Sequence, residues 1–232
     1  VLLADPGARA DPPLLGAPFR VARGRGLAVG DVVVLYERGD RVRELTLTPG
    51  GQHQNHCGVF HHDVEREKEV EEGGRWGLRV RRLSVDPPSL PSHAQDWIGL
   101  PYGSRVATRN GAGRALLLPP TPELWTRCLP HRTQILYAAD VALVCSLLEL
   151  APGCAVLESG TGSGALTHAL ARAVAPGGRV DTFEFHQGRA DAARAEFERH
   201  GLADVVQCHV RDVQSNGFGP GAGAGDADAV FL

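Results

Sequence analysis

The chain has 232 residues, 43% of them hydrophobic, and a formal net charge of −3 at pH 7. This length suits one large or two modest domains, and the weakly acidic balance excludes a chain that binds nucleic acid through its own net charge. No apolar run reaches the roughly 18 residues of a membrane span. The five cysteines include no CxxC pair, so they indicate reduced thiols rather than a disulfide framework.

The first half of the chain predicts a small β domain. Residues 1–26, rich in Ala, Pro, Gly and Arg, are expected to form a loose arm, and residues 27–118 the domain itself. Its short, turn-separated strands favour a barrel-like or sandwich-like arrangement. The charged, proline-bearing segment near 63–92 is predicted to be an inserted loop. Strands are predicted at Gly30–Tyr36, Arg41–Leu47, Cys57–Phe60, Trp76–Leu83, Ser104–Thr108 and Arg114–Leu118.

A histidine-rich cluster lies within this domain. It consists of His53, His56, Cys57, His61 and His62. Zinc uses these residue types, but their spacing matches no zinc finger or ribbon. A polar hairpin tip is therefore the preferred interpretation, and no metal site is expected.

The second half, residues 119–232, predicts an α/β domain. Prolines between Pro119 and Pro130 indicate a hinge, and apolar residues at helical spacing predict a helix within Thr133–Leu150. From Ala155 onward, strands alternate with helices, which is typical of a parallel sheet with covering helices. The helices are predicted at Ala165–Ala175 and Ala190–His200, and the later strands at Arg179–Phe185, Val205–Val210 and Asp228–Leu232. The glycine-rich stretch Gly217–Gly225 is predicted to be a spacer.

The most informative segment is Ala155–Ala165, which reads AVLESGTGSGA. A short apolar strand ends at the acid Glu158, and a turn with glycines at 160, 162 and 164 leads into a helix. Glycines let the backbone approach a ligand closely, and the helix N-terminus then points at that ligand. An acid at the mouth of the turn repels a pyrophosphate and attracts a cation. S-adenosylmethionine, which carries an ammonium and a sulfonium, is therefore the favoured ligand.

Two further acids follow at strand ends. Glu184 lies near the end of the second predicted strand, where an acid can accept hydrogen bonds from ribose hydroxyls. Asp212 follows the third strand, where a carboxylate can accept a bond from the exocyclic amine of adenine. The glycines also satisfy G-x-G-x-x-A, so a dinucleotide enzyme or a purely structural turn stays open. The three acids together favour the methyl donor.

Four segments together resemble the catalytic subunits of eukaryotic tRNA (adenine-58-N1)-methyltransferases. These segments are Thr121–Val144 (with LPHRTQILY), Leu157–Arg172 (with ESGTGSG), Glu184–Arg194 and Arg211–Val213. The resemblance covers most of the chain from about Gly30 onward and is densest from Pro119. It implies a Rossmann-like class I methyltransferase domain, incomplete at its C-terminus, preceded by a small β-barrel-like domain.

The resemblance also implies individual residue roles. The donor site should use Gln134, Leu136, Glu158, Gly160, Gly162, Ser163, Gly164, Ala165, Glu184, Arg189, Asp212 and Val213. The family has an aspartate directly after the fourth strand, close to donor and target base. Here that position falls just beyond Leu232, so no catalytic residue is named, and the sequence is expected to be an inactive piece of a longer chain. The absence of methionine supports that expectation.

The implied reaction is transfer of a methyl group from S-adenosylmethionine to N1 of adenine 58 in tRNA. The base must leave its stack to expose N1. The implied partners are tRNA and a non-catalytic tRNA-binding subunit, with two copies of each subunit. The family implies a nuclear location, with the mitochondrial relative as the alternative. Two other functions stay open: a methyltransferase of the same fold acting on protein or a small molecule, and a binding-only subunit.

Overall fold

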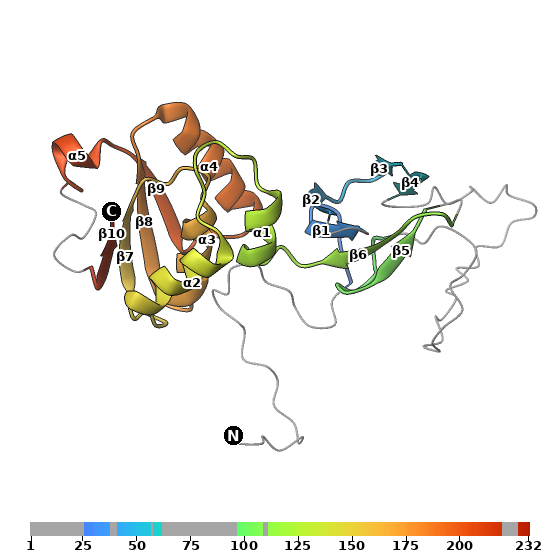
Figure 1. Cartoon of the computed structure of the whole chain (residues 1–232), viewed down its shortest axis with the longest axis horizontal. Helices are drawn as coiled ribbons and strands as arrows, with labels where there is room; N and C mark the ends of the chain where they lie inside the picture. The colour runs from blue at the N-terminus through green and yellow to red at the C-terminus, as the bar shows by residue number, and fades with distance from the viewer. Residues whose placement is uncertain (1–25, 38–40, 57, 62–96, 109–110, 220–226) are drawn as a thin grey trace, which may run out of the picture. The chain divides into compact units, whose positions relative to one another are not determined.

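A computed structural model describes residues 26–37, 41–56, 58–61, 97–108, 111–219 and 227–232, and it divides into two compact units (Figure 1). One unit holds most of the described residues up to Leu118, and the other holds those from Pro119 onward together with Val42–Glu44. Three predicted features lie wholly or almost wholly outside the described residues: the arm at 1–26, the strand at Trp76–Leu83 and the inserted loop near 63–92. Most of the spacer at Gly217–Gly225 lies outside them as well.

The N-terminal unit contains a four-stranded sheet and a two-stranded hairpin. The sheet has the order β2 (Arg41–Thr46), β1 (Val32–Glu37), β6 (Arg114–Leu118) and β5 (Arg105–Ala107), and β6 is antiparallel to both β1 and β5. The hairpin pairs β3 (Gln52–Asn55) with β4 (Gly58–His61). The sequence predicted every one of these strands except β3. Its residues, QHQN, are all polar, so no apolar alternation marks it as a strand.

Part of the histidine cluster belongs to this hairpin. His53 is buried, its ring stacks on Phe60, and its Nε2 lies 3.1 Å from a carboxylate oxygen of Glu37. Asn55 donates a hydrogen bond of 2.8 Å to the same oxygen. Within the described ranges, no three His, Cys, Asp or Glu side chains come together to hold a metal ion, and Cys57 and His62 lie outside those ranges. His53 therefore works here as a packing and hydrogen-bonding residue.

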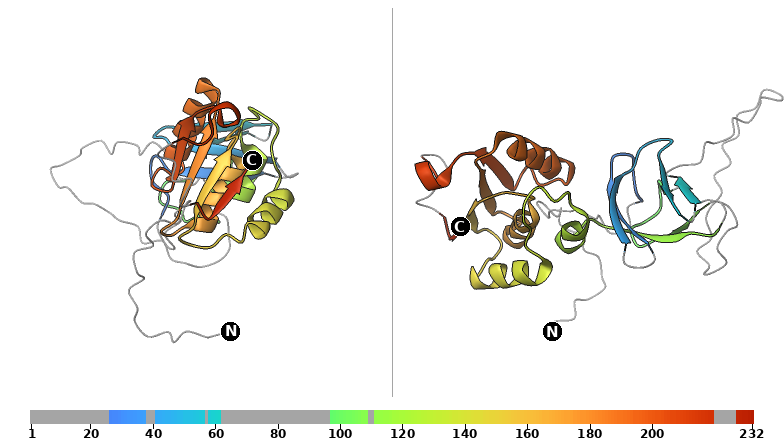
Figure 2. Two further views of the ribbon diagram at one scale, coloured as in Figure 1. Left: turned by 90° about the vertical axis from the view of Figure 1, so that its left-hand side faces the viewer. Right: turned by 45° about the horizontal axis from the view of Figure 1, so that its top comes forward.

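The C-terminal unit is built on a parallel sheet with the order β10 (Ala229–Phe231), β7 (Ala155–Ser159), β8 (Arg179–Glu184) and β9 (Val206–Val210). These strands are labelled in Figure 1, and the left view of Figure 2 shows the sheet from another side. Helix α3 (Ala165–Val174) links β7 to β8, and α4 (Gln187–Arg199) links β8 to β9. The predicted α/β class is therefore confirmed. After β9 the chain returns to the opposite side of β7, and this reversal is the place where open α/β sheets bind ligands.

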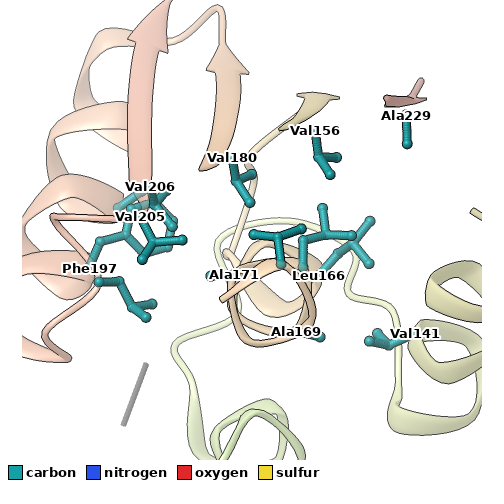
Figure 3. Close-up of a cluster of buried hydrophobic side chains, with 14 residues drawn as sticks. Val141, Val156, Leu166, Ala169, Ala171, Val180, Phe197, Val205, Val206 and Ala229 are labelled. Carbon is teal, nitrogen blue, oxygen red and sulfur yellow. The ribbon is translucent and has the colours of Figure 1, made fainter. Parts of the chain in front are cut away.

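One hydrophobic core joins this sheet to its helices. Figure 3 shows Val156, Val180 and Val206 pointing from three strands toward the helical layer, where Leu166 and Phe197 meet them. Val156 and Val180 are fully buried. Each fully buried side chain of this size contributes roughly 1.5–3 kcal/mol, so this layer fixes α3 against β7 and β8.

The predicted hinge at Pro119–Pro130 is wrong in its middle part. That region contains helix α1 (Pro122–Cys128), and Trp125 within it is completely buried. The Thr121 hydroxyl accepts a hydrogen bond of 3.4 Å from the Leu124 backbone N–H. Pro122 lies in the first turn of α1, where backbone N–H groups have no partner within the helix, so the missing N–H of proline costs nothing. This proline therefore begins a helix and does not mark a hinge.

The predicted helix at Thr133–Leu150 is shorter in the structure. Helix α2 spans Ala138–Leu147, and residues 130–137 form no helix or strand. The last short helix, α5, spans Val213–Asn216. No helix in the described part of the chain is long and apolar enough to cross a membrane.

Arg132 fixes the non-helical segment against the sheet. Its guanidinium donates two hydrogen bonds, of 2.6 and 2.9 Å, to the Glu196 carboxylate on α4. Its backbone N–H donates to the Ser163 hydroxyl at 3.0 Å, and the Thr133 N–H donates to the same hydroxyl at 3.2 Å. The segment is thereby held over the glycine turn between β7 and α3.

Replacing Glu196 by Gln is expected to lower the free energy of unfolding by about 2 to 4 kcal/mol, because it leaves the guanidinium of Arg132 without its countercharge in a site where the two side chains are 15% and 7% exposed. Equilibrium urea unfolding followed by circular dichroism measures this loss. Glu123→Gln is the matched control. It breaks the Arg172–Glu123 pair, whose side chains are 47% and 49% exposed, and is expected to cost under about 1 kcal/mol. Equal losses in the two variants would contradict the role given to Arg132.

Candidate functional site

The glycine turn between β7 and α3 has a backbone that other residues rarely adopt. Gly160 has φ +97° and Gly162 has φ +53°. A Cβ atom at Gly162 would lie 2.6 Å from the Thr133 hydroxyl oxygen, closer than real Cβ contacts allow. Glycine is therefore required at 162 both by its backbone angle and by the close approach of the 131–136 segment.

Two adjoining hollows open beside this turn, one of about 400 Å³ and one of about 60 Å³. They share Thr133, Gln134, Gly160 and Gly162 in their linings. All twelve residues predicted from the sequence line one hollow or the other. The larger takes Gln134, Gly160, Gly162, Glu184, Arg189, Asp212 and Val213; the smaller takes Gln134, Leu136, Glu158, Gly160, Gly162, Ser163, Gly164 and Ala165.

Glu158 lies in the smaller hollow and is 2% exposed. The Thr167 hydroxyl on α3 donates a hydrogen bond of 2.6 Å to its Oε2 atom. Burial raises the pKa of the Glu158 carboxyl to about 7, against the opposing hydrogen bonds of Thr167 and Thr182. The sequence placed this acid at the mouth of the turn. The structure places it beneath the turn, in a setting that favours its neutral form.

Glu184 lies in the larger hollow and remains ionised. It accepts hydrogen bonds of 3.1 Å from the backbone N–H groups of Gly162 and His186, and one of 2.6 Å from Arg189. Burial by itself would raise the pKa of Glu184, but these donors outweigh it, and the pKa lies below its usual value. The Arg189 guanidinium also lies 4.7 Å from the ring centre of Phe185, an exposed aromatic at the same hollow.

Asp212 follows β9 and caps helix α5. Its carboxylate accepts hydrogen bonds from the Ser215 N–H at 3.1 Å and the Ser215 hydroxyl at 2.7 Å. These bonds lower the pKa of Asp212, which is exposed to solvent at the rim of the larger hollow. Each carboxylate oxygen keeps a second acceptor position, so Asp212 can still receive a donor from a ligand.

Sequence reasoning missed several residues of the site. Thr133 lines both hollows, Phe185 and Arg211 line the larger one, and Phe231 lines the smaller one. Thr167 holds Glu158 without being part of any recognised motif. Phe231 is the register partner of Glu158 across two parallel strands that are far apart in the sequence. Only the strand order reveals such a neighbour.

The strand order and the place of these hollows define the class of the C-terminal unit as a Rossmann-like methyltransferase fold. An O-methyltransferase from Thermotoga maritima, described as dependent on S-adenosylmethionine, aligns with TM-score 0.63 and 23% identity, over 90% of this chain and 64% of that one. A structure named tRNA (m1A58) methyltransferase TrmI, from Aquifex aeolicus, aligns with TM-score 0.54 and 22% identity, over 82% of this chain and 60% of that one. These similarities establish the fold.

The family follows from the sequence. Residues 113–232, more than half of the chain, match the family described as "tRNA methyltransferase complex GCD14 subunit", and the chain belongs to this family. Proteins named tRNA (adenine(58)-N(1))-methyltransferase catalytic subunit are similar to it: 37% identical over 206 residues in Cryptococcus neoformans, and 34% over 204 residues in Dictyostelium discoideum. The matches cover 89% and 88% of this chain, and 40% and 55% of those relatives.

The buried Glu158 carboxyl is expected to make stability fall as pH rises. In the unfolded chain it loses its proton near the ordinary glutamate pKa of 4.5, and in the folded chain its pKa is about 7. Between these values the folded state binds more protons, so the free energy of unfolding should drop by about 2 to 3 kcal/mol between pH 5 and pH 8. In Glu158→Gln, which keeps an acceptor for Thr167, this part of the pH dependence should be absent. Urea unfolding of both proteins across this range measures the difference, and parallel profiles would contradict the assignment.

Proposed function

We propose that this chain binds S-adenosylmethionine and belongs to the catalytic subunit that transfers its methyl group to N1 of adenine 58 in tRNA. The observation that carries the proposal is the pair of adjoining hollows, which gathers three acids in three different electrostatic settings at the carboxyl ends of neighbouring strands. Membership of the family and the names of the relatives support the same reaction.

The residues present fit a cationic nucleoside. Within the described part of the chain, Glu158 forms no ion pair, and no other charged side chain lines the smaller hollow. A buried acid in that situation gains most from a cation supplied by a ligand. At Gly162 the space beside the backbone is taken by the Thr133 hydroxyl, but a Cβ at Gly160 would meet no atom within 4 Å, so the turn is open to a ligand beside Gly160. These features match the ammonium and sulfonium of the donor.

The larger hollow would hold the nucleoside end. Glu184 is held in place by two backbone N–H groups and Arg189, so its carboxylate is fixed before a ligand arrives. Such a carboxylate accepts hydrogen bonds from a pair of ribose hydroxyls. Asp212 and Val213 at the same hollow would contact the base. Gln134, Leu136, Ser163, Gly164 and Ala165 would surround the methionine end.

When bound, the donor supplies an electrophilic methyl group on sulfur. Adenine N1 carries a lone pair at neutral pH, so the chain needs no strong base to remove a proton first. Its residues would act mainly by holding the two reacting atoms close and in line. In such reactions this positioning lowers the activation barrier by a large part. The aspartate that the family resemblance places just beyond Leu232, and that is expected to orient the adenine, stays a prediction.

The proposed partners follow from the substrate. A chain with a net charge of −3 needs additional basic surface to bind an anionic tRNA. A second, non-catalytic subunit that binds tRNA would provide it, in an assembly with two copies of each subunit. A nuclear location is also a prediction, supported by the family resemblance.

Glu184→Gln is expected to weaken binding of S-adenosylmethionine about 10- to 100-fold, because hydrogen bonds from hydroxyls to a carboxylate lose roughly 1.5–3 kcal/mol when the charge is removed. Isothermal titration calorimetry on the full-length protein measures the dissociation constant. The control is Glu198→Gln on the exposed side of α4, where a change under about twofold is expected. Unfolding midpoints of both variants separate lost binding from lost folding. Unchanged affinity in a folded Glu184→Gln protein would overturn the assignment of the larger hollow.

Methyl transfer tests the substrate. The full-length protein, co-expressed with its partner subunit, is expected to move labelled methyl from S-adenosylmethionine to a tRNA transcript with adenine at position 58. A transcript with guanine at that position should accept no label there. Label appearing on protein or on small molecules instead would favour a different methyltransferase of the same fold. Donor binding without any transfer would favour a binding-only subunit.

A further inference from the structure

We propose that binding of a positively charged ligand releases a proton from the Glu158 carboxyl, which Thr167 positions. An uncharged nucleoside binds without proton release. The inference rests on the proposed function, since it takes S-adenosylmethionine as the ligand. It adds to that site two residues that determine specificity and a proton that is released when the ligand binds.

The geometry isolates the Glu158 carboxyl. It sits at the carboxyl end of β7, flanked in register by Thr182 on β8 and Phe231 on β10. Thr167, itself completely buried on α3, donates its hydroxyl hydrogen to Oε2 at 2.6 Å. That bond fixes one oxygen. The other residues lining the smaller hollow are uncharged, so the hollow itself provides no countercharge to stabilise the carboxylate.

The charged and titratable groups on the described elements around the hollow do not supply a free positive charge either. On the segment that covers the turn, the Arg132 guanidinium is paired with the Glu196 carboxylate. On α3, His168 is held between the Gly164 carbonyl and His200, and burial lowers its pKa to about 3, so it is neutral. On β9, burial raises the pKa of the Cys208 thiol, which is also neutral near pH 7. On β8, Glu184 is negative and paired with Arg189. Strand β10 carries only Ala, Val and Phe.

A cation entering the hollow reverses this balance. With the hollow empty, burial favours the protonated form of Glu158 below about pH 7. When an ammonium or sulfonium binds beside it, the O–H bond breaks, the carboxylate keeps the electron pair, and the proton passes to solvent. The Thr167 hydroxyl then donates to a full carboxylate, where its hydrogen bond is stronger. A neutral nucleoside offers no such compensation and leaves the proton in place.

Two consequences follow for affinity. Because binding releases a proton, affinity for the donor should increase about fivefold between pH 6 and pH 7, from the fraction of Glu158 that is already ionised at a pKa of about 7. Affinity for an uncharged nucleoside should stay flat over the same interval. The site would thus select against adenosine-type molecules that lack the positive charge.

Calorimetry at pH 6.0 in buffers with different heats of ionisation counts the protons. At this pH the α-amino group of S-adenosylmethionine is already protonated, since α-amino groups titrate at about 7.7–8.0. The full-length protein is expected to release about 0.9 proton per S-adenosylmethionine bound, which is the fraction of Glu158 still protonated at this pH when its pKa is about 7. Uncharged 5′-methylthioadenosine should release none. Glu158→Gln should release none with either nucleoside.

Thr167 variants test the positioning role. In Thr167→Val the carboxylate loses its hydroxyl donor, so the rise of donor affinity with pH should shift to higher pH, and Thr167→Ser should restore the original profile. A residue that only maintains the fold would weaken affinity equally at every pH. Donor binding without proton release, or an unshifted profile in Thr167→Val, would overturn this inference and leave the proposed function standing. Absence of donor binding by the wild-type protein would overturn both.

Discussion

The turn between β7 and α3 depends on a segment that is remote in sequence. Arg132 bonds to Glu196 on α4, and its backbone N–H donates to Ser163 in the turn. The contact brings Thr133 so close to Gly162 that no side chain fits there. Both hollows are lined by this segment on one side and by the turn on the other. Without the buried Arg132–Glu196 pair, the segment that lines one side of both hollows would not be held in place.

The three acids of the site carry the same carboxyl group, but their surroundings give each of them a different charge state or exposure. Glu158 is buried without a countercharge and holds its proton up to about pH 7. Glu184 is also buried, but two backbone N–H groups and Arg189 keep it ionised. Asp212 is exposed and caps a helix turn. A ligand with a positive group at one end and hydroxyls further along matches this order of settings.

The sequence was most informative where a signal is local. Alternation of strands and helices after Ala155 predicted the parallel sheet, because each element carries its own apolar period. It failed where a local signal is ambiguous. The prolines around α1 suggested a hinge, yet Pro122 begins a helix whose Trp125 is buried. Strand β3 was missed because its four residues are polar, and pairing with β4 decides its conformation.

The sequence by itself determined the strand–turn–helix unit, the glycines within it and the acids at the strand ends, because these follow from backbone preferences and apolar periods. The family resemblance supplied most of the other residues among the twelve that were predicted and that lie in the linings of the two hollows. Only the tertiary structure decided that Glu158 is buried under the turn, that Thr167 holds it and that Phe231 lies beside it. The reason is physical: the charge state of a carboxyl depends on which atoms exclude water from it, and those atoms come from β8, β10 and α3, which the linear order does not place together.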